Sequence, residues 1–134
     1  MNVRSERENS SRLERFLVID DHPLFCEAIT MTLHNFVDVS EVTSAHSLAD
    51  AMKLISAGFD PDTILLDLNL PDVNSIDGLL QLRNALPSTP VVVISSLNDN
   101  RIISRVMQAG AVGFIPKDTD GAELERAFKQ IRGG

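Results

Sequence analysis

The feature that most constrains the fold is a regular alternation between short apolar runs and longer amphipathic segments. The apolar runs are rich in β-branched residues, and a continuous run of this length is typical of a strand buried on both faces. The second strand is weaker and alternates with polar residues, as expected near a sheet edge. The expected strands cover residues 16–19, 37–42, 63–67, 91–95 and 112–116.

The segments between these runs carry apolar residues at helical spacing and are bounded by proline, glycine or capping residues. Ser47 with Asp50 resembles a capping box, and Gly58 follows the last residue of that helix. Asp77 is expected to cap the third helix, and Asp99 or Asn98 the fourth, which Gly110 terminates. The expected helices cover about residues 23–36, 47–57, 77–86, 99–109 and 120–132.

Strict alternation of strands and helices predicts parallel βαβ units with right-handed crossovers and helices on both faces of one sheet. The fold class is therefore α/β, a three-layer α/β/α sandwich around a five-stranded parallel sheet. The order 2-1-3-4-5 is the commoner arrangement for five strands, although periodicity alone does not determine it. We expect a flexible tail over residues 1–15 and one domain over residues 16–134.

Composition excludes several classes of protein. The net charge of −7 argues against a bare nucleic-acid-binding domain, which would present a basic surface. Cys26 is the only cysteine, so neither an internal disulfide nor a thiolate metal cluster can form, and we expect it to be a core residue. With no apolar run of about 18 residues and no signal-like N-terminus, a cytoplasmic location is expected.

Polar residues follow four of the expected strands at the point where each strand ends. They are Asp20 and Asp21, then Asp67, then Ser95, and finally Lys117. Each one alone is explained by a turn, a helix cap or a solvated charge. Because ligands bind parallel sheets at the carboxyl ends of their strands, their joint occurrence predicts a functional site.

Three carboxylates brought close together repel one another and require compensation by positive charge. Mg²⁺ is the natural partner because it prefers carboxylates, waters and phosphate oxygens as ligands. Lys117 and Ser95 would contact the oxygens of a phosphoryl group. Asp67 is then a candidate nucleophile that forms an acyl phosphate, a known covalent role for aspartate.

The strings 16–23, 65–71, 91–96 and 110–118 resemble the receiver domains of two-component response regulators. The resemblance covers about Arg15 to Gly134 and implies the flavodoxin-like receiver fold. It is strongest to regulators with a LuxR-type helix-turn-helix output, because of the Asp20-Asp21-His22-Pro23 start and the Lys117-Asp118 pair. Those regulators continue into a DNA-binding domain, so we expect this chain to be the front part of a longer transcription factor.

The resemblance implies a phosphoacceptor, Asp67, which takes its phosphoryl group from a histidine kinase or a phosphotransfer protein. It implies that Mg²⁺ is held by Asp21 and Asp67 directly, by Asp20 through water, and by the main-chain carbonyl of Asn69. Ser95 and Lys117 would bind the phosphoryl oxygens.

Ser95 and Phe114 would form a switch pair that repacks the surface of the fourth helix, the fifth strand and the fifth helix. The domain would catalyse only its own phosphorylation and dephosphorylation, and is not otherwise an enzyme. DNA would be reached only through the output domain, no membrane partner is expected, and a homodimer formed on phosphorylation is left open.

Three positions depart from the family pattern. The loop from Pro71 to Gly78 carries three residues more than the usual Pro-x-x-Asp-Gly. Asp118 replaces the proline that commonly follows the lysine, so no slow isomerisation is expected at that bond. The switch aromatic is Phe114, which lacks the hydroxyl of the commoner tyrosine.

Other interpretations were weighed. His22, His34 and His46 lack a metal-binding helical spacing, which favours ordinary surface or capping roles. A flavodoxin-like FMN carrier would need a hydroxyl-rich phosphate loop after the first strand, and usually Trp or Tyr, which the chain lacks. A phosphatase with an aspartyl-phosphate intermediate would need Asp-x-Asp there. The complete acid, hydroxyl and lysine set speaks against a degenerate receiver.

Overall fold

The computed structural model describes residues 14–36, 39–97 and 99–133. These residues form one five-stranded parallel sheet in the order β2-β1-β3-β4-β5, which confirms the predicted fold class and strand order. The edge position of β2 agrees with its weaker apolar pattern. The strands are β1 (Glu14–Ile19), β2 (Val39–Ala45), β3 (Thr63–Asp67), β4 (Val91–Ser95) and β5 (Gly113–Pro116).

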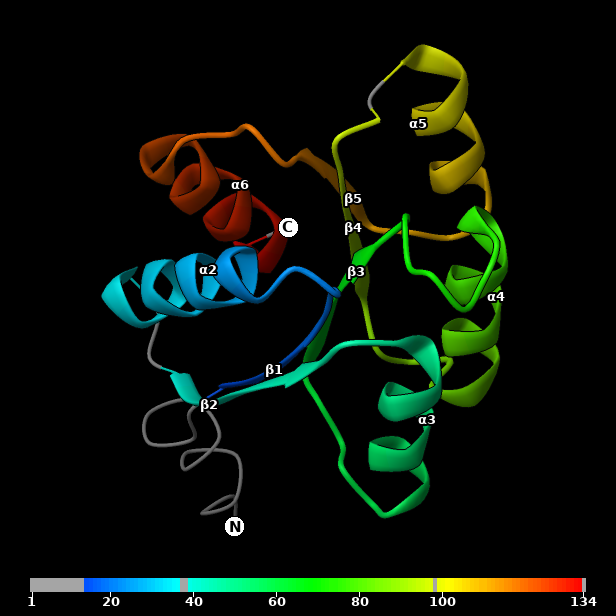
Figure 1. Ribbon diagram of the computed structural model, residues 1–134. Helices are drawn as coiled ribbons and strands as arrows, with labels where there is room; N and C mark the ends of the chain where they lie inside the picture. The colour runs from blue at the N-terminus through cyan, green and yellow to red at the C-terminus, as the bar shows by residue number, and fades with distance from the viewer. Residues whose placement is uncertain (1–13, 37–38, 98, 134) are drawn as a thin grey trace, which may run out of the picture.

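Helices cover both faces of the sheet, as three layers require. Figure 1 shows α2 and α6 together on one face, and α3, α4 and α5 on the other. The helices are α2 (Pro23–Phe36), α3 (Leu48–Ser56), α4 (Ser75–Ala85), α5 (Asn100–Gln108) and α6 (Gly121–Gly133). None of the helices in the described part of the chain is long and apolar enough to cross a lipid bilayer.

The strands are buried on both faces because their side chains alternate between two cores. In β3, Ile64 and Leu66 pack on the side of α3, α4 and α5, whereas Leu65 packs on the side of α2 and α6. On the second side, the rings of Phe16 and Phe128 meet edge to face, with their centroids 6.1 Å apart. This double burial explains the continuously apolar runs of the central strands.

Most predicted boundaries agree with the structure. β3 and β4 have the predicted bounds, and both predicted C-terminal glycines, Gly58 and Gly110, adopt positive φ angles of 104° and 106°. β1 begins at Glu14, two residues before the predicted start, because Glu14 and Arg15 pair with β2. The prediction for Val37 lies outside the described residues.

The predicted caps are confirmed with one exception. The hydroxyl oxygen of Ser47 accepts a hydrogen bond from the Asp50 amide, and the Asp99 carboxylate accepts one from the Ile102 amide. Asp99, one of the two candidates for this second cap, is therefore the N-cap of α5, and the other candidate, Asn98, lies outside the described residues. The carboxylate of Asp120 caps α6 through the Glu123 amide at 2.8 Å.

The prediction that Asp77 caps α4 is wrong. The helix begins at Ser75 and its N-cap is Asn74, whose carbonyl accepts a hydrogen bond from the Asp77 amide at 2.8 Å. Asp77 lies in the first turn instead. The earlier start lets Ile76 pack against the apolar core from within the helix. The last two residues between Pro71 and Asp77, Ser75 and Ile76, are therefore helical.

Candidate functional site

The register of the sheet brings the predicted polar residues to one edge. Ile19 pairs with Leu66, so Asp20 and Asp67 follow at neighbouring positions at the ends of β1 and β3. On the other side, β4 pairs with β3 and β5, and the Lys117 amide donates a hydrogen bond to the Ser95 carbonyl at 3.0 Å. The carboxyl ends of four strands therefore meet at one place, as the strand-end pattern predicted.

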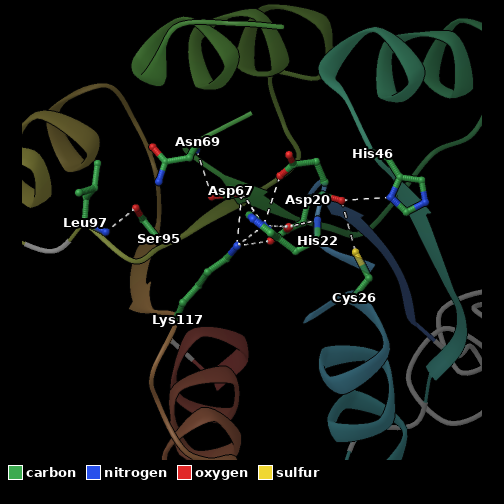
Figure 2. Close-up of polar contacts among 10 residues, drawn as sticks. Asp20, His22, Cys26, His46, Asp67, Asn69, Ser95, Leu97 and Lys117 are labelled. Atoms are coloured by element: carbon green, nitrogen blue, oxygen red, sulfur yellow. Dashed lines mark hydrogen bonds and ion pairs between the residues drawn. The ribbon is translucent and has the colours of Figure 1, made fainter. Parts of the chain in front are cut away.

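Lys117 reaches across this edge to two buried carboxylates. Its Nζ atom lies 2.8 Å from Oδ2 of Asp20 and 3.4 Å from Oδ2 of Asp67. The side chains of Asp20 and Asp67 are only 2% and 1% exposed, so the charges interact in a region from which water is largely excluded. Figure 2 shows the lysine extending from the end of β5 towards both carboxylates.

The backbone of Asp20 is held from two sides. Its carbonyl oxygen lies 3.5 Å from Sγ of Cys26 and 3.2 Å from Nδ1 of His46 (Figure 2). Cys26 is buried, which confirms its predicted place in the core. Burial, together with the charge of Asp20, raises the pKa of its thiol. The cysteine therefore supports the site as a neutral group rather than as a reactive thiolate.

His22 is the residue of this site that sequence reasoning missed. Its Nδ1 atom lies 2.9 Å from Asp20, 3.3 Å from Asp21 and 3.8 Å from Asp67, measured to carboxylate oxygens, and 3.0 Å from Nζ of Lys117. The interpretation as an ordinary surface or capping residue accounts for its 59% exposed side chain but not for these contacts. Its position directly after two aspartates was the available signal.

The environment of the site raises the pKa of two of its residues, Asp67 and Lys117. Burial, supported by the charge of Asp20, raises the pKa of Asp67, although the Asn69 amide and Lys117 act against this rise. Burial alone would lower the pKa of Lys117, but its contacts with Asp20 and Asp67 outweigh this effect and raise it. Lys117 is therefore a permanent cation beside the carboxylates.

The remaining predicted residues surround this cluster. The amide of Asn69 donates a hydrogen bond to Oδ1 of Asp67 at 3.1 Å. Ser95 is completely buried, and its hydroxyl oxygen accepts a hydrogen bond from the Leu97 amide at 3.0 Å (Figure 2). Phe114 lies on β5, half-buried against the core beneath α3, α4 and α5. The structure thus joins the acids and the lysine directly, whereas the Ser95 hydroxyl bonds the Leu97 amide and the Phe114 ring packs against the core.

The donor atoms of the cluster suit a hard divalent cation. One ligand atom each from Asp20, Asp21, His22 and Asp67 can be chosen so that all lie within 4.8 Å of one another. Two buried carboxylate oxygens, Oδ2 of Asp20 and Oδ1 of Asp21, have basic neighbours in the described part of the chain, Nζ of Lys117 at 2.8 Å and Nδ1 of His22 at 3.3 Å. Three carboxylates against one ammonium leave an excess of negative charge that a cation would offset.

Comparison with known proteins identifies the family. The sequence-family model for the response regulator receiver domain matches residues 16–129 of this chain. The glycerol metabolism activator of Pseudomonas putida is 39% identical over 120 residues, which cover 90% of this chain and 54% of that protein. The nitrate/nitrite response regulator NarL of Escherichia coli is 32% identical over 118 residues, covering 88% and 54%. The chain spans about half the length of these curated relatives.

Solved structures agree with the sequence relatives. The signal receiver domain of a NarL response regulator from Mycobacterium tuberculosis superposes with a TM-score of 0.78 at 32% identity, covering 92% of this chain and 99% of that one. A LuxR family DNA-binding response regulator from Silicibacter pomeroyi gives a TM-score of 0.78 at 34% identity, covering 89% and 91%. Because the family match, the relatives and the described fold span the same residues, this chain belongs to the receiver domains of two-component response regulators.

Proposed function

We propose that this receiver domain is phosphorylated on Asp67. The observation that carries the proposal is the position of the Lys117 ammonium, 3.4 Å from Oδ2 of Asp67 and 2.8 Å from Oδ2 of Asp20. A cation bridging two buried carboxylates at the edge of a parallel sheet is suited to receive the oxygens of a phosphoryl group.

The proposed reaction is a phosphoryl transfer from a phosphohistidine of a kinase or phosphotransfer protein. A carboxylate oxygen of Asp67 attacks the phosphorus atom, the P–N bond breaks with its electron pair going to the imidazole, and an acyl phosphate forms. Lys117 neutralises charge on the transferred oxygens, and the Ser95 hydroxyl donates to another of them. The protein contributes position and charge, because the transfer needs little covalent chemistry from it.

Mg²⁺ is the cation that we propose for the acidic cluster. Asp21 and Asp67 would hold it directly, Asp20 through water, and Asn69 through its main-chain carbonyl. When bound, the ion would supply positive charge to the phosphoryl oxygens. Ligand atoms of Asp20, Asp21 and Asp67 that lie within 4.8 Å of one another, with one ammonium beside them, support this assignment.

Phosphorylation would act on the rest of the domain through Ser95 and Phe114. The Ser95 hydroxyl would leave the Leu97 amide, to which it is bonded at 3.0 Å, and turn towards the phosphoryl group. The half-buried Phe114 ring would then turn inwards from β5. The surface formed by α5, β5 and α6 would be repacked, and this surface would act on an output.

The output that we propose is transcription, through a DNA-binding domain outside this chain. Several relatives bear names that describe them as transcriptional regulators or DNA-binding activators, and the chain covers about half of each. The partners would be a histidine kinase or phosphotransfer protein, with a homodimer as one route from phosphorylation to output.

The decisive experiment compares Asp67→Asn with the unmodified chain in labelling by acetyl phosphate or a phosphorylated kinase in the presence of Mg²⁺. We expect hydroxylamine-sensitive labelling of the unmodified chain and none of the variant, with the fold retained. The exposed Asp60→Asn is the matched control and should be labelled normally. Undiminished labelling of Asp67→Asn would mean that the acceptor is another residue.

The switch is tested separately, with Mg²⁺ and beryllofluoride as a phosphoryl mimic. Side-chain NMR signals or a structure should show Ser95 and Phe114 changing together. Phosphorylation without movement of either residue would contradict the switch while leaving the phosphoacceptor in place.

A further inference from the structure

The loop that departs in length from the family pattern is attached to a neighbouring helix by one carboxylate. Oδ1 of Asp72 accepts a hydrogen bond from the Leu48 amide at 3.1 Å, and Oδ2 accepts one from the Ala49 amide at 3.0 Å. These amides open α3, which is 24 residues away in sequence. The loop after Asp67 is therefore fixed at Asp72 by a two-point contact with another element.

This contact is separate from the helix's own cap. Ser47, the N-cap residue of α3, bonds the Asp50 amide through its hydroxyl at 3.0 Å. Asp72 bonds the two amides that precede Asp50, so the residues divide the first three amides of the helix between them. The hydrogen bonds donated by the backbone amides of Ala49 and Leu48 lower the pKa of Asp72, and the bond from Ala49 has the larger effect. The side chain is therefore a carboxylate at neutral pH.

The same stretch of chain also touches the other side of the acidic cluster. His46, two residues before Leu48, lies with its Nδ1 atom 3.2 Å from the Asp20 carbonyl. The segment from β2 into α3 thus contacts both the end of β1 and the loop that follows β3. This segment therefore links the end of β1, which carries Asp20, to the loop after β3, which follows Asp67.

The short segment between Asp67 and Asp72 is fixed by alternating apolar packing and hydrogen bonding. Leu68 and Leu70 are each 4% exposed and pack in the core on the side of α3, α4 and α5. Asn69 lies between them and donates its amide to Asp67. Apolar packing has no preferred direction, whereas hydrogen bonds do. The two bonds of Asp72 are therefore suited to orient the backbone at this end of the segment.

We propose that Asp72 is a positioning residue for the metal site, which holds the segment from Asn69 to Pro71 against the N-terminus of α3. The proposal rests on the proposed function, in which the main-chain carbonyl of Asn69 is a metal ligand. A longer loop has more conformational freedom to lose, and tying its first part to a helix removes that freedom before the ion binds. The two hydrogen bonds of Asp72 thus compensate for the additional length of the loop.

The experiment measures Mg²⁺ affinity of the full chain by NMR titration of backbone amides, for Asp72→Ala, Asp72→Asn and Ser47→Ala. Both alanine variants remove a cap from the same helix end, but only Asp72→Ala releases the loop. We expect Asp72→Ala to weaken Mg²⁺ binding about tenfold, as for other groups that orient metal ligands. Asp72→Asn keeps one acceptor oxygen, so its Mg²⁺ affinity should lie between those of Asp72→Ala and the unmodified chain. Ser47→Ala should bind Mg²⁺ as tightly as the unmodified chain does.

Two further measurements separate positioning from simple loss of stability. Amide hydrogen exchange should quicken at Leu48 and Ala49 in Asp72→Ala, and at Asp50 in Ser47→Ala. Acyl phosphate formation from acetyl phosphate by Asp72→Ala should be slow at low Mg²⁺ and should recover at saturating Mg²⁺, since the reacting groups are intact.

These measurements separate the positioning role of Asp72 from the proposed Mg²⁺-dependent phosphorylation of Asp67. Unchanged Mg²⁺ affinity in Asp72→Ala would overturn the positioning role alone, as would an equal loss of affinity in Ser47→Ala. Failure of the unmodified chain to bind Mg²⁺ would overturn both the proposed function and this role. A loss confined to the Asp72 variants would support both.

Discussion

The ammonium group of Lys117 lies over the ring of Phe25, with Nζ 4.8 Å from the ring centroid. The ring comes from the first turn of α2 and packs with the core shared by α2 and α6. The lysine is therefore held by an aromatic face as well as by the carboxylates of Asp20 and Asp67. α2 therefore contributes to the site through this side chain, in addition to the aspartates that lie between β1 and α2.

We predict that Phe25→Leu slows phosphorylation severalfold and lowers the free energy of unfolding by about 1 kcal/mol. Leucine keeps the apolar contact but removes the ring face, whose attraction for a cation is worth about 0.5–2 kcal/mol. The rate with acetyl phosphate at saturating Mg²⁺ and urea unfolding test this. Phe25→Tyr keeps the ring and should retain the rate; a normal rate in Phe25→Leu would show that the ring does not position Lys117.

Lys117→Ala should remain folded but lose about a hundredfold in the rate of phosphorylation, the order found when one preorganised donor is removed. The variant loses the only ammonium group that the described structure places on Asp20 and Asp67. Lys129→Ala is the control of equal charge, because Lys129 pairs on the surface with Glu125 at 2.9 Å. Wild-type rates and switching in Lys117→Ala would contradict the assignment.

Asp67→Asn should stabilise the metal-free protein at neutral pH. Burial raises the pKa of Asp67 in the folded state. Below the ordinary aspartate pKa, near 3.9, the carboxyl is protonated whether folded or not, and the variant has no advantage. As the pH rises through the raised folded pKa, the unmodified protein loses stability that the amide retains.

Urea unfolding in EDTA from pH 4 to pH 8 measures this difference. The exposed Asp60→Asn should show no such pH-dependent gain. A neutral-pH stability of Asp67→Asn below that of the unmodified chain would mean that Lys117 more than offsets the burial of this carboxylate.

Gly110→Ala should destabilise the protein more than Gly58→Ala, although the two glycines have nearly the same φ. Both substitutions incur the strain of a left-handed residue, about 1 kcal/mol. At Gly58 an added Cβ meets no atom within 4 Å, whereas at Gly110 it would overlap the guanidinium of Arg83. Arg83 also donates to the Gly110 carbonyl at 3.2 Å, so this bond would be lost and the cost would rise to about 2 kcal/mol.

A double-mutant cycle with Arg83→Ala isolates that contact in thermal or urea unfolding. Gly110→Ala should cost less in the Arg83→Ala background than alone, because the overlap is gone. Additive losses would show that Arg83 moves aside freely.

The sequence was a good guide to the strands because the central ones are buried on both faces. Burial on both faces requires unbroken apolar runs, and such runs specify Thr63–Asp67 and Val91–Ser95 to the residue. It was a poorer guide to the start of α4. Asp77 is a favourable cap by residue type, but packing of Ile76 against the core favours a start at Ser75.

The sequence by itself determined the alternation of elements and the acids, hydroxyl and lysine at the strand ends, because both follow from local patterns and from the parallel sheet they imply. Only the tertiary structure decided what surrounds those groups. The ring of Phe25 over Lys117, the imidazole of His22 near Asp67 and Lys117, and the bonds of Asp72 to α3 join elements distant in sequence. Such contacts depend on sheet register, helix position and side-chain rotamer together, and no local pattern encodes that combination.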